Sequence, residues 1–282
     1  MLEALKCLNS EWQGCENPIL QGGATKLAQE LFQHDKFLKI DDSLQPPLEK
    51  QSGVFALNAI GQRFLYVLKT LEDLAPEKIM TVGGSCGTEA APVSYLNKLY
   101  KGNLAVVWFD AHGDLNTPKS SPSGHFHGMV LRTLLGEGPD VFCKQMDRPI
   151  VSRQVFLAGV RDLDEAEQEY INNSNITISD INGKLADQIL SSGFKKAYIH
   201  IDVDVFNPDD FSDALMPTKG GPMCSELTDC LSMISNQLDI VGVGIVEFCG
   251  EKQGTAKQVS KILRDAGITK RWRGTRLTAR PF

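Results

Sequence analysis

The stretch Val106–Met129, VVWFDAHGDLNTPKSSPSGHFHGM, determines how the rest of the chain is interpreted. It opens with an apolar run that indicates a buried strand. Asp110, His112 and Asp114 follow at the carboxyl end of this strand, two residues apart. Side chains at this spacing point the same way in an extended segment, so the three groups can converge just beyond a sheet edge. Such an arrangement of carboxylates and imidazole is typical of a metal site.

Composition and charge exclude several classes of protein. The 282 residues are 42% hydrophobic and 23% charged, as in globular proteins. The net charge of −6 argues against a nucleic-acid binder, which needs a basic face. The basic segment Lys270–Arg280 is typical of a solvated or subunit-facing end. No run approaches the ~20 apolar residues of a membrane span. Neither nucleic acid nor a membrane is therefore an expected partner.

The cysteines indicate the compartment. Seven of them, at positions 7, 15, 86, 143, 224, 230 and 249, form an odd and scattered set without a C-x-x-C pair. This set argues against a disulfide framework and predicts a reducing, cytoplasmic location. The N-terminus, MLEALKCLNSEWQG, lacks the charged-then-apolar pattern of a secretion signal.

Strands and helices are predicted to alternate along most of the chain. The first fifty residues are weakly patterned, with a helix expected near Thr25–Phe32, a short strand near Phe37–Ile40 and a loop over Asp41–Ser52 that contains Pro46 and Pro47. Further strands are expected at Glu77–Val82, Leu104–Asp110, Gln154–Gly159, Ile176–Ser179, Lys196–Val203 and Ile240–Phe248. Further helices are expected at Asn58–Leu74, Thr88–Leu99, Gly128–Leu135, Glu165–Asn172, Gly183–Leu190, Cys224–Ile234 and Thr255–Leu263.

This alternation specifies a mainly parallel sheet covered by helices on both faces. No linker divides the chain, so one α/β domain over residues 1–282 is expected. Ligands of such sheets bind outside the carboxyl ends of the strands. Polar groups are predicted at five of these ends: Gly83–Gly87, Asp110–Asp114, Arg161 with Asp162 and Asp164, Asp202 with Asp204, and Glu247.

A second acidic motif, His200-Ile-Asp202-Val-Asp204, strengthens the metal hypothesis. A lone Asp-x-Asp at a strand end is more often a cap or turn former. Two such motifs, each after an apolar strand, favour a metal site instead. Four buried carboxylates would repel one another and resist ionisation unless divalent cations neutralise them. Carboxylates with one or two imidazoles suit Mn, Fe, Co or Zn, and two bridged metals lower the pKa of a shared water.

The two motifs resemble the metal signatures of the ureohydrolase superfamily, which comprises arginases, agmatinases and formiminoglutamases. The likeness runs from about Gly83 to Glu247 and is closest to the arginase branch. It implies an arginase-like three-layer α/β/α sandwich with a mainly parallel central sheet. It also implies a dimetal site, usually manganese, a small guanidino substrate, and a homo-trimer or homo-hexamer.

The same resemblance implies roles for the metal-binding residues. Asp110 and Asp202 would bridge the two metals, and His112 and Asp204 would complete one site. Asp114 would ligate the other metal and orient the attacking hydroxide. The family usually carries His at the position of Cys86, as a ligand of that second metal.

A further set of residues resembles the substrate-binding groups of arginases. The loop Ser121–Gly128 would supply His127 as the proton shuttle. Glu247 would pair with the guanidinium, a planar cation with paired donors. The amino-acid end would be held by Asn116, Ser123, Asp164 and, where arginases usually carry Asn, His125. Alternatively, Asn116 is a turn residue, Ser123 a polar loop residue and His125 an exposed side chain.

The main departure from the family is the block Gly83-Gly84-Ser85-Cys86-Gly87, where Gly-Gly-Asp-His-Ser is usual. A thiolate suits Zn or Fe better than Mn(II). Two Mn(II) ions per chain are therefore expected, or one if Cys86 stays protonated. Cys86 could instead be a small buried residue beside the site. The cysteine also resembles a hydroxyarginine-hydrolysing branch.

The leading hypothesis is a metal-dependent amidinohydrolase that hydrolyses the guanidino group of arginine or a close relative by metal-bound hydroxide. The products would be a urea-type compound and ornithine. The alternatives within this chemistry are an Nω-hydroxyarginine hydrolase, an agmatinase or a formiminoglutamase. From another class, the chain could be a catalytically silent arginase-like scaffold or an amino-acid binder.

Overall fold

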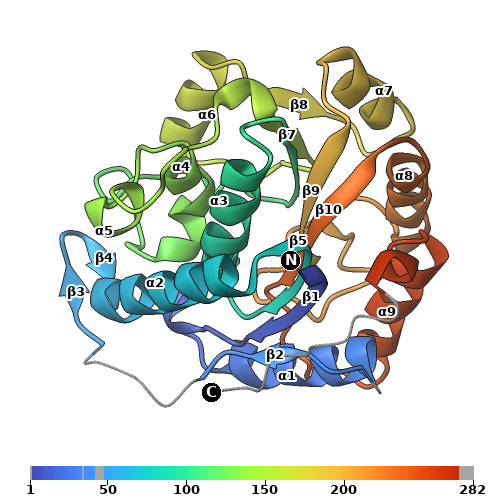
Figure 1. The fold of residues 1–282 in the computed structure, drawn as a ribbon, viewed down its shortest axis with the longest axis horizontal. Coiled ribbons are helices and arrows are strands. Elements are labelled where there is room, and N and C mark those ends of the chain that lie inside the picture. Colours follow the sequence, from blue (N-terminus) through green and yellow to red (C-terminus); the bar gives the residue numbers. More distant parts are fainter. Residues whose placement is uncertain (1, 34, 42–47, 273–282) are drawn as a thin grey trace.

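A parallel eight-stranded sheet forms the middle layer of the computed structural model, which describes residues 2–33, 35–41 and 48–272 (Figure 1). The strands, in chain order, are β1 (Leu2–Asn9), β2 (Leu38–Lys39), β5 (Pro76–Gly83), β6 (Ala105–Phe109), β7 (Val155–Ala158), β8 (Thr177–Ser179), β9 (Lys196–Asp202) and β10 (Asp239–Val246). They lie in the order β2-β1-β5-β10-β9-β6-β7-β8, and every neighbouring pair is parallel. The predicted parallel sheet is confirmed.

Helices cover both faces of this sheet. One face packs against α1 (Ile19–Phe32), α7 (Lys184–Ser191), α8 (Cys224–Gln237) and α9 (Thr255–Asp265). The other face packs against α2 (Leu57–Leu74), α3 (Ala90–Leu99), α4 (Val130–Leu134), α5 (Asp140–Cys143) and α6 (Glu165–Asn172). Figure 1 shows α2 and α3 on one side of the strands and α8 and α9 on the other. The fold is the predicted three-layer α/β/α sandwich.

Strand β6 shows why these strands are continuous apolar runs. Val107 and Phe109 belong to the hydrophobic core beneath α7, α8 and α9, whereas Val106 and Trp108 belong to the core beneath α2 and α3. All four side chains are fully buried, because a parallel sheet with helices on both faces leaves neither side in water. Asp110 follows directly, at the point where the strand reaches the sheet edge.

The N-terminal part of the chain departs from the expectation. Leu2–Asn9 forms the long strand β1, although the first fifty residues looked weakly patterned. Lys6 is buried within this strand and pairs with Asp35, so a charged residue interrupts the apolar run that would have revealed it. An antiparallel hairpin of β3 (Lys50–Gln51) and β4 (Val54–Phe55) also lies partly in the segment predicted as a loop.

The remaining predicted helices and strands all occur, with ends shifted by a few residues, except that α1 begins at Ile19 rather than near Thr25. Two predictions fall partly outside the described residues: the loop around Pro46 and Pro47, and the basic segment from residue 273 onward. Within the described parts of the chain, no helix is long and apolar enough to cross a membrane.

The sheet order gathers the five strands whose ends were predicted to carry polar groups. These strands, β5, β10, β9, β6 and β7, are consecutive neighbours. Because they are parallel, their carboxyl ends open at the same edge, where ligands bind in such sheets. The fold therefore places five polar loops around one point.

Helix α1 packs closely against the segment that follows β10, and two glycines of this helix allow the packing to be tested. A Cβ at Gly23 would come within 1.8 Å of the carbonyl oxygen of Phe248, whereas a Cβ at Gly22 would meet nothing within 4 Å. We expect Gly23→Ala to lower the free energy of unfolding by about 1–3 kcal/mol, because the backbone must move. Gly22→Ala should raise it by up to about 1 kcal/mol. Urea denaturation measures the free energy of unfolding of both variants. If the two substitutions changed it equally, the close packing at Gly23 would be contradicted.

Candidate metal centre

Three groups of possible metal ligands lie together at the carboxyl edge of the sheet. In the first, one ligand atom each of Asp110, His112 and Asp204 lies within 4.8 Å of the others. The Nδ1 atom of His112 is 3.0 Å from Asp204 Oδ2 and 3.4 Å from Asp110 Oδ1. The ends of β6 and β9, which are neighbours in the sheet, position these residues. This group matches one of the two sites implied by the resemblance.

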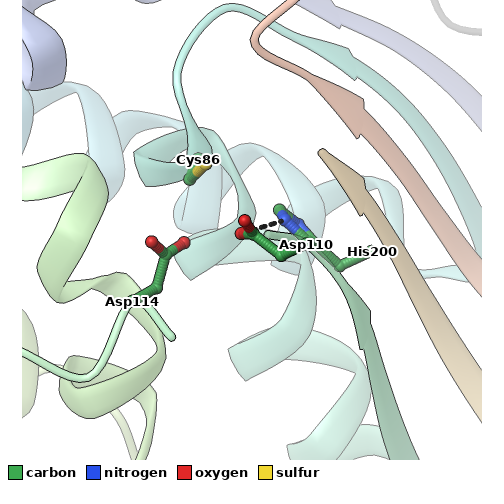
Figure 2. A group of neighbouring side chains, drawn as sticks. All are labelled: Cys86, Asp110, Asp114 and His200. Atoms are coloured by element: carbon green, nitrogen blue, oxygen red, sulfur yellow. Dashed lines mark ion pairs between the residues drawn. The ribbon is translucent and has the colours of Figure 1, made fainter. Parts of the chain in front are cut away.

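Cys86 belongs to the other two groups. One contains Cys86, Asp110, Asp114 and His200 (Figure 2), and the other contains Cys86, Asp202 and Glu247. The thiol donates a hydrogen bond to Asp202 Oδ2 at 3.2 Å. Cys86 therefore faces the carboxylates rather than packing beside them, which favours a ligand role over that of a small buried residue.

Two of the acidic residues have an unusual backbone conformation. Asp114 has a φ of +52° and Glu247 a φ of +61°, a left-handed region that residues other than glycine seldom adopt. Hydrogen bonds hold both: Asp114 O accepts from Arg132 N, and Glu247 N donates to Gly84 O. Strained residues held in this way are concentrated at functional sites.

Burial shifts the acidity of the carboxylates. Burial and then neighbouring carboxylates raise the pKa of Asp114 and of Asp202 well above the usual value, and that of Asp204 to about 6. Asp110 differs, because its attraction to the nearby imidazoles of His112 and His200 outweighs the effect of burial and lowers its pKa. The expectation that every carboxylate resists ionisation is therefore wrong for Asp110. Two imidazoles already compensate its charge.

The donor set fits divalent cations. Burial and the nearby charges of Asp114 and Asp202 raise the pKa of the Cys86 thiol well above 9.0, so a thiolate here needs a positive partner. Several buried polar atoms of the described residues have no hydrogen-bond partner: Asp114 Oδ2, Glu247 Oε2, His112 Nε2 and both ring nitrogens of His200. Such atoms cost free energy. Cations among them would satisfy several donors and offset the repulsion between carboxylates.

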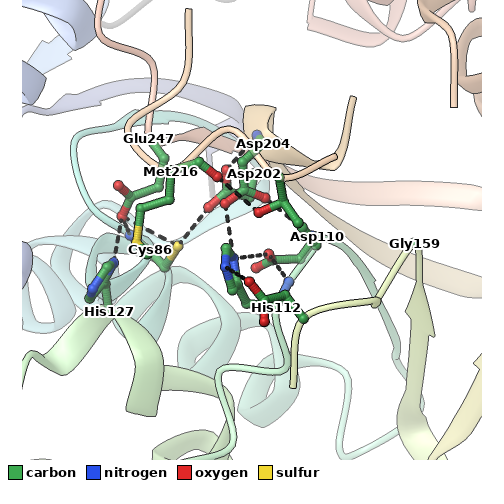
Figure 3. Close-up of polar contacts among 12 residues, drawn as sticks. Cys86, Asp110, His112, His127, Gly159, Asp202, Asp204, Met216 and Glu247 are labelled. Atoms are coloured by element: carbon green, nitrogen blue, oxygen red, sulfur yellow. Dashed lines mark hydrogen bonds and ion pairs between the residues drawn. The ribbon is translucent and has the colours of Figure 1, made fainter. Parts of the chain in front are cut away.

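His127 and Glu247 face each other beside the carboxylates (Figure 3). His127 Nδ1 lies 3.3 Å from Glu247 Oε1, which also accepts a hydrogen bond from Cys86 N at 3.1 Å. Burial lowers the pKa of His127, but the hydrogen bond and charge of Glu247 outweigh it and raise the pKa above 6.5. His127 can therefore hold a proton next to the other oxygen of Glu247, which has no hydrogen-bond partner among the described residues.

Some of the residues predicted to hold the amino-acid end of the substrate contact one another. Asn116 is buried, and its Nδ2 donates to Asp164 Oδ2 at 2.7 Å, which disfavours a simple turn role. Ser123 is exposed in the same loop, where its hydroxyl accepts from His125 N. His125 Nε2 lies 3.2 Å from Glu16 Oε2, so the His125 ring is held by a partner.

The sequence suggested no particular role for two residues near the centre, Glu167 and His200. Glu167 accepts hydrogen bonds from the backbone N–H groups of Leu115 and Asp164, and so ties together two predicted substrate segments. The spacing of Asp164 and Glu167 is that of a capping box, a signal the sequence offered. His200 lies two residues before Asp202 and so on the same face of β9, which was a second available signal.

Comparison with known proteins identifies the family of the chain. The model of the Arginase family matches residues 22–267, so the chain belongs to the arginase family. An arginase from Staphylococcus aureus (strain MRSA252) is 32% identical over 179 residues, which cover 60% of this chain and 59% of that arginase. In this alignment the chain thus spans little more than half of the relative's length.

Solved structures share the fold over nearly the whole chain. The crystal structure of Entamoeba histolytica arginase in complex with L-ornithine has a TM-score of 0.84 at 21% identity, covering 95% of this chain and 99% of that one. The arginase from Bacillus caldovelox has a TM-score of 0.83 at 21% identity, covering 99% and 100%. At this identity, the likeness establishes the arginase-like three-layer fold.

The metal-free protein should reveal the repulsion between these carboxylates. Because the folded pKa values of Asp114, Asp202 and Asp204 are raised, the folded state binds more protons than the unfolded chain, and stability should fall as pH rises from 4 through 6. With EDTA at pH 8, we expect Asp202→Asn to raise the free energy of unfolding, since it removes an opposed buried charge. With excess Mn(II), the wild type should gain stability and the variant should gain less.

Asp213→Asn is the matched control. Asp213 is equally buried, but it accepts hydrogen bonds from Glu251 N, Lys252 N and Thr255 Oγ1. Its replacement should destabilise the protein by about 1–3 kcal/mol with or without metal. If Asp202→Asn also destabilised the metal-free protein, the carboxylates would not be in conflict there. Denaturant unfolding at both metal conditions provides the comparison.

Proposed function

We propose that this protein is a metal-dependent amidinohydrolase that cleaves the guanidino group of arginine or a close relative. The observation that carries the proposal is the convergence of four buried carboxylates with Glu247 and His127 at one sheet edge. Membership of the arginase family supports the same chemistry. We infer two divalent cations per chain, with Mn(II) as the expected metal and one site made softer by Cys86.

The substrate would lie with its guanidinium at Glu247 and its amino-acid end at the substrate loop. The unpartnered Oε2 of Glu247 suits a planar cation with paired N–H donors. At the other end, Asn116 and Ser123 would bind the α-carboxylate, Asp164 would bind the α-ammonium, and His125 would lie beside them. The E. histolytica relative was crystallised in complex with L-ornithine, which supports a ligand with an amino-acid end.

The protein's own residues would then carry the proton and hold the reacting groups. When bound, a pair of divalent cations would lower the pKa of a shared water and so supply the nucleophile. Asp114 would orient this water by accepting a hydrogen bond. Water adds to the guanidino carbon, and the bond from this carbon to the side-chain nitrogen breaks. His127 donates a proton to the leaving amine, and a proton released by the water returns to His127. The products are urea and ornithine.

Cys86 favours one second candidate, a hydrolase of Nω-hydroxyarginine. The thiol belongs to two ligand groups but is a weak partner for Mn(II) unless deprotonated. A substrate N-hydroxyl would bring a further oxygen donor to that side of the centre. The product would then be hydroxyurea instead of urea. A catalytically silent scaffold or amino-acid binder would release neither.

We also infer the setting of the enzyme. One catalytic domain would span residues 1–282, since both helix layers pack on the same sheet. All seven cysteines are free thiols, which supports a reducing cytoplasm. The homo-trimer or homo-hexamer stays a prediction from the resemblance.

A substrate panel tests the proposal directly. Protein loaded with Mn(II) should release urea from arginine, or hydroxyurea from Nω-hydroxyarginine, together with ornithine. Glu247→Gln should lower kcat/KM by about 10–100-fold, because it removes a charged hydrogen-bond partner of the guanidinium. Glu77→Gln, an exposed change elsewhere, is the control and should leave kcat/KM unchanged. Release of neither product by metal-loaded protein would refute the proposal.

Ser123 tests which end of the substrate is recognised. Ser123→Ala should raise KM for arginine by about tenfold with little change in kcat, because one hydrogen bond to the α-carboxylate is lost. Agmatine has no α-carboxylate, so its KM or inhibition constant should change less than about twofold. Asp164→Asn should weaken the binding of both arginine and agmatine, because agmatine keeps the amino group that Asp164 would bind. If Ser123→Ala weakened the binding of arginine and of agmatine equally, the proposed orientation of the substrate would be contradicted.

A further inference from the structure

His200 is a fully buried histidine just below the acidic residues, and the resemblance assigns it no role. It lies on β9, where its register partners are Trp108 on β6 and Gly244 on β10. The imidazole stacks on the Trp108 indole, with ring centroids 3.5 Å apart and an interplanar angle of 6°. Its orientation is therefore fixed by packing.

One edge of this imidazole faces the candidate metal ligands. Its Nε2 lies 3.7 Å from Asp110 Oδ2. A nitrogen of His200 also lies within 4.8 Å of ligand atoms of Cys86 and Asp114. Figure 2 shows these side chains together with Asp110. Neither ring nitrogen has a hydrogen-bond partner among the described residues. A buried nitrogen left unpaired costs free energy, and a cation among these donors would pair with it.

The other edge of the imidazole faces a carboxylate. Nδ1 of His200 lies 3.6 Å from Oε2 of Glu89, which accepts a hydrogen bond from Tyr198 Oη at 2.8 Å. Glu89 and Tyr198 are fully buried. A Cβ at Gly244 would come within 1.8 Å of Glu89 Oε2, so β10 leaves space for this carboxylate. Histidines that bind metals usually donate their other N–H to a carboxylate, a backbone carbonyl or water, and Glu89 is in place to be such a partner.

We propose that His200 is a ligand, through Nε2, of the metal held by Cys86, Asp110 and Asp114, with its Nδ1–H donated to Glu89. The inference rests on the proposed function only in requiring a cation at this point. The imidazole that the family usually places at position 86 is supplied here from β9. This site would have one sulfur, one nitrogen and two carboxylate donors. It is therefore softer than the site of His112, Asp110 and Asp204, and it favours Zn, Fe or Co.

X-ray absorption at the zinc edge tests this ligand set. The His112→Asn variant, loaded with one equivalent of zinc, lacks the imidazole of the other site. We expect a sulfur scatterer at about 2.3 Å, which marks the Cys86 site, together with a nitrogen at about 2.0–2.1 Å and the outer-shell scattering of an imidazole. The double variant His112→Asn/His200→Phe should keep the sulfur and lose the imidazole.

Each other outcome overturns the inference in a distinguishable way. If the zinc of His112→Asn shows sulfur but no imidazole, His200 is not a ligand. The same follows if the imidazole signal persists in the double variant. Both results leave the proposed function intact. Zinc bound without sulfur means that Cys86 does not hold the metal, and this also refutes the proposed set. A wild-type protein that binds no metal refutes both this inference and the proposed function.

Metal affinity provides a second readout that does not depend on activity. His200→Phe keeps a ring against Trp108 but removes both nitrogens, and we expect zinc affinity to fall at least about 100-fold in chelator competition. Glu89→Gln should lower the affinity about 10–100-fold, because the partner of Nδ1–H is weakened. His125→Gln, which changes a histidine paired with Glu16, is the control for zinc affinity and should change it less than about twofold. Unchanged affinity in His200→Phe would overturn the proposal.

Discussion

Four carboxylates are buried at a single edge of the sheet, and their mutual repulsion is the main electrostatic constraint on this site. Three backbone N–H groups offset part of their repulsion: His112 N donates to Asp110, Ala111 N to Asp204, and Asp204 N to Asp202. These bonds do not satisfy every oxygen, and the pKa values of three carboxyls stay raised. Bound cations would remove the remaining conflict, which supports the proposed metal centre.

Arg161 shows how the surrounding backbone is held around this centre. Its guanidinium donates to the carbonyl oxygens of Gly159, Asp204, Phe206, Thr218 and Lys219. It thereby joins the end of β7 to the loop that follows Asp204. Because backbone carbonyls occupy these donors, the positive charge stays near the acidic groups without pairing directly with one of them. The carboxylates would thus stay available for the proposed cations.

The sequence predicted the fold well wherever burial on both sides of a strand produced an apolar run, as in Ala105–Phe109. It failed at Leu2–Asn9, where the buried ion pair of Lys6 interrupts the run. The metal carboxylates could be predicted because their two-residue spacing brings them to one face. His200 shares this spacing, but its role depends on Trp108, Glu89 and Gly244 from other elements. Contacts between distant segments leave no local pattern in the sequence.

We infer that these carboxylates hold a pair of divalent cations. Anomalous diffraction from crystals grown with Mn(II) tests it most directly. We expect two peaks about 3.5–4 Å apart with Asp110 and Asp202 between them, one near Asp114 and the other near His112 and Asp204. The absence of any anomalous peak among the four carboxylates would contradict it.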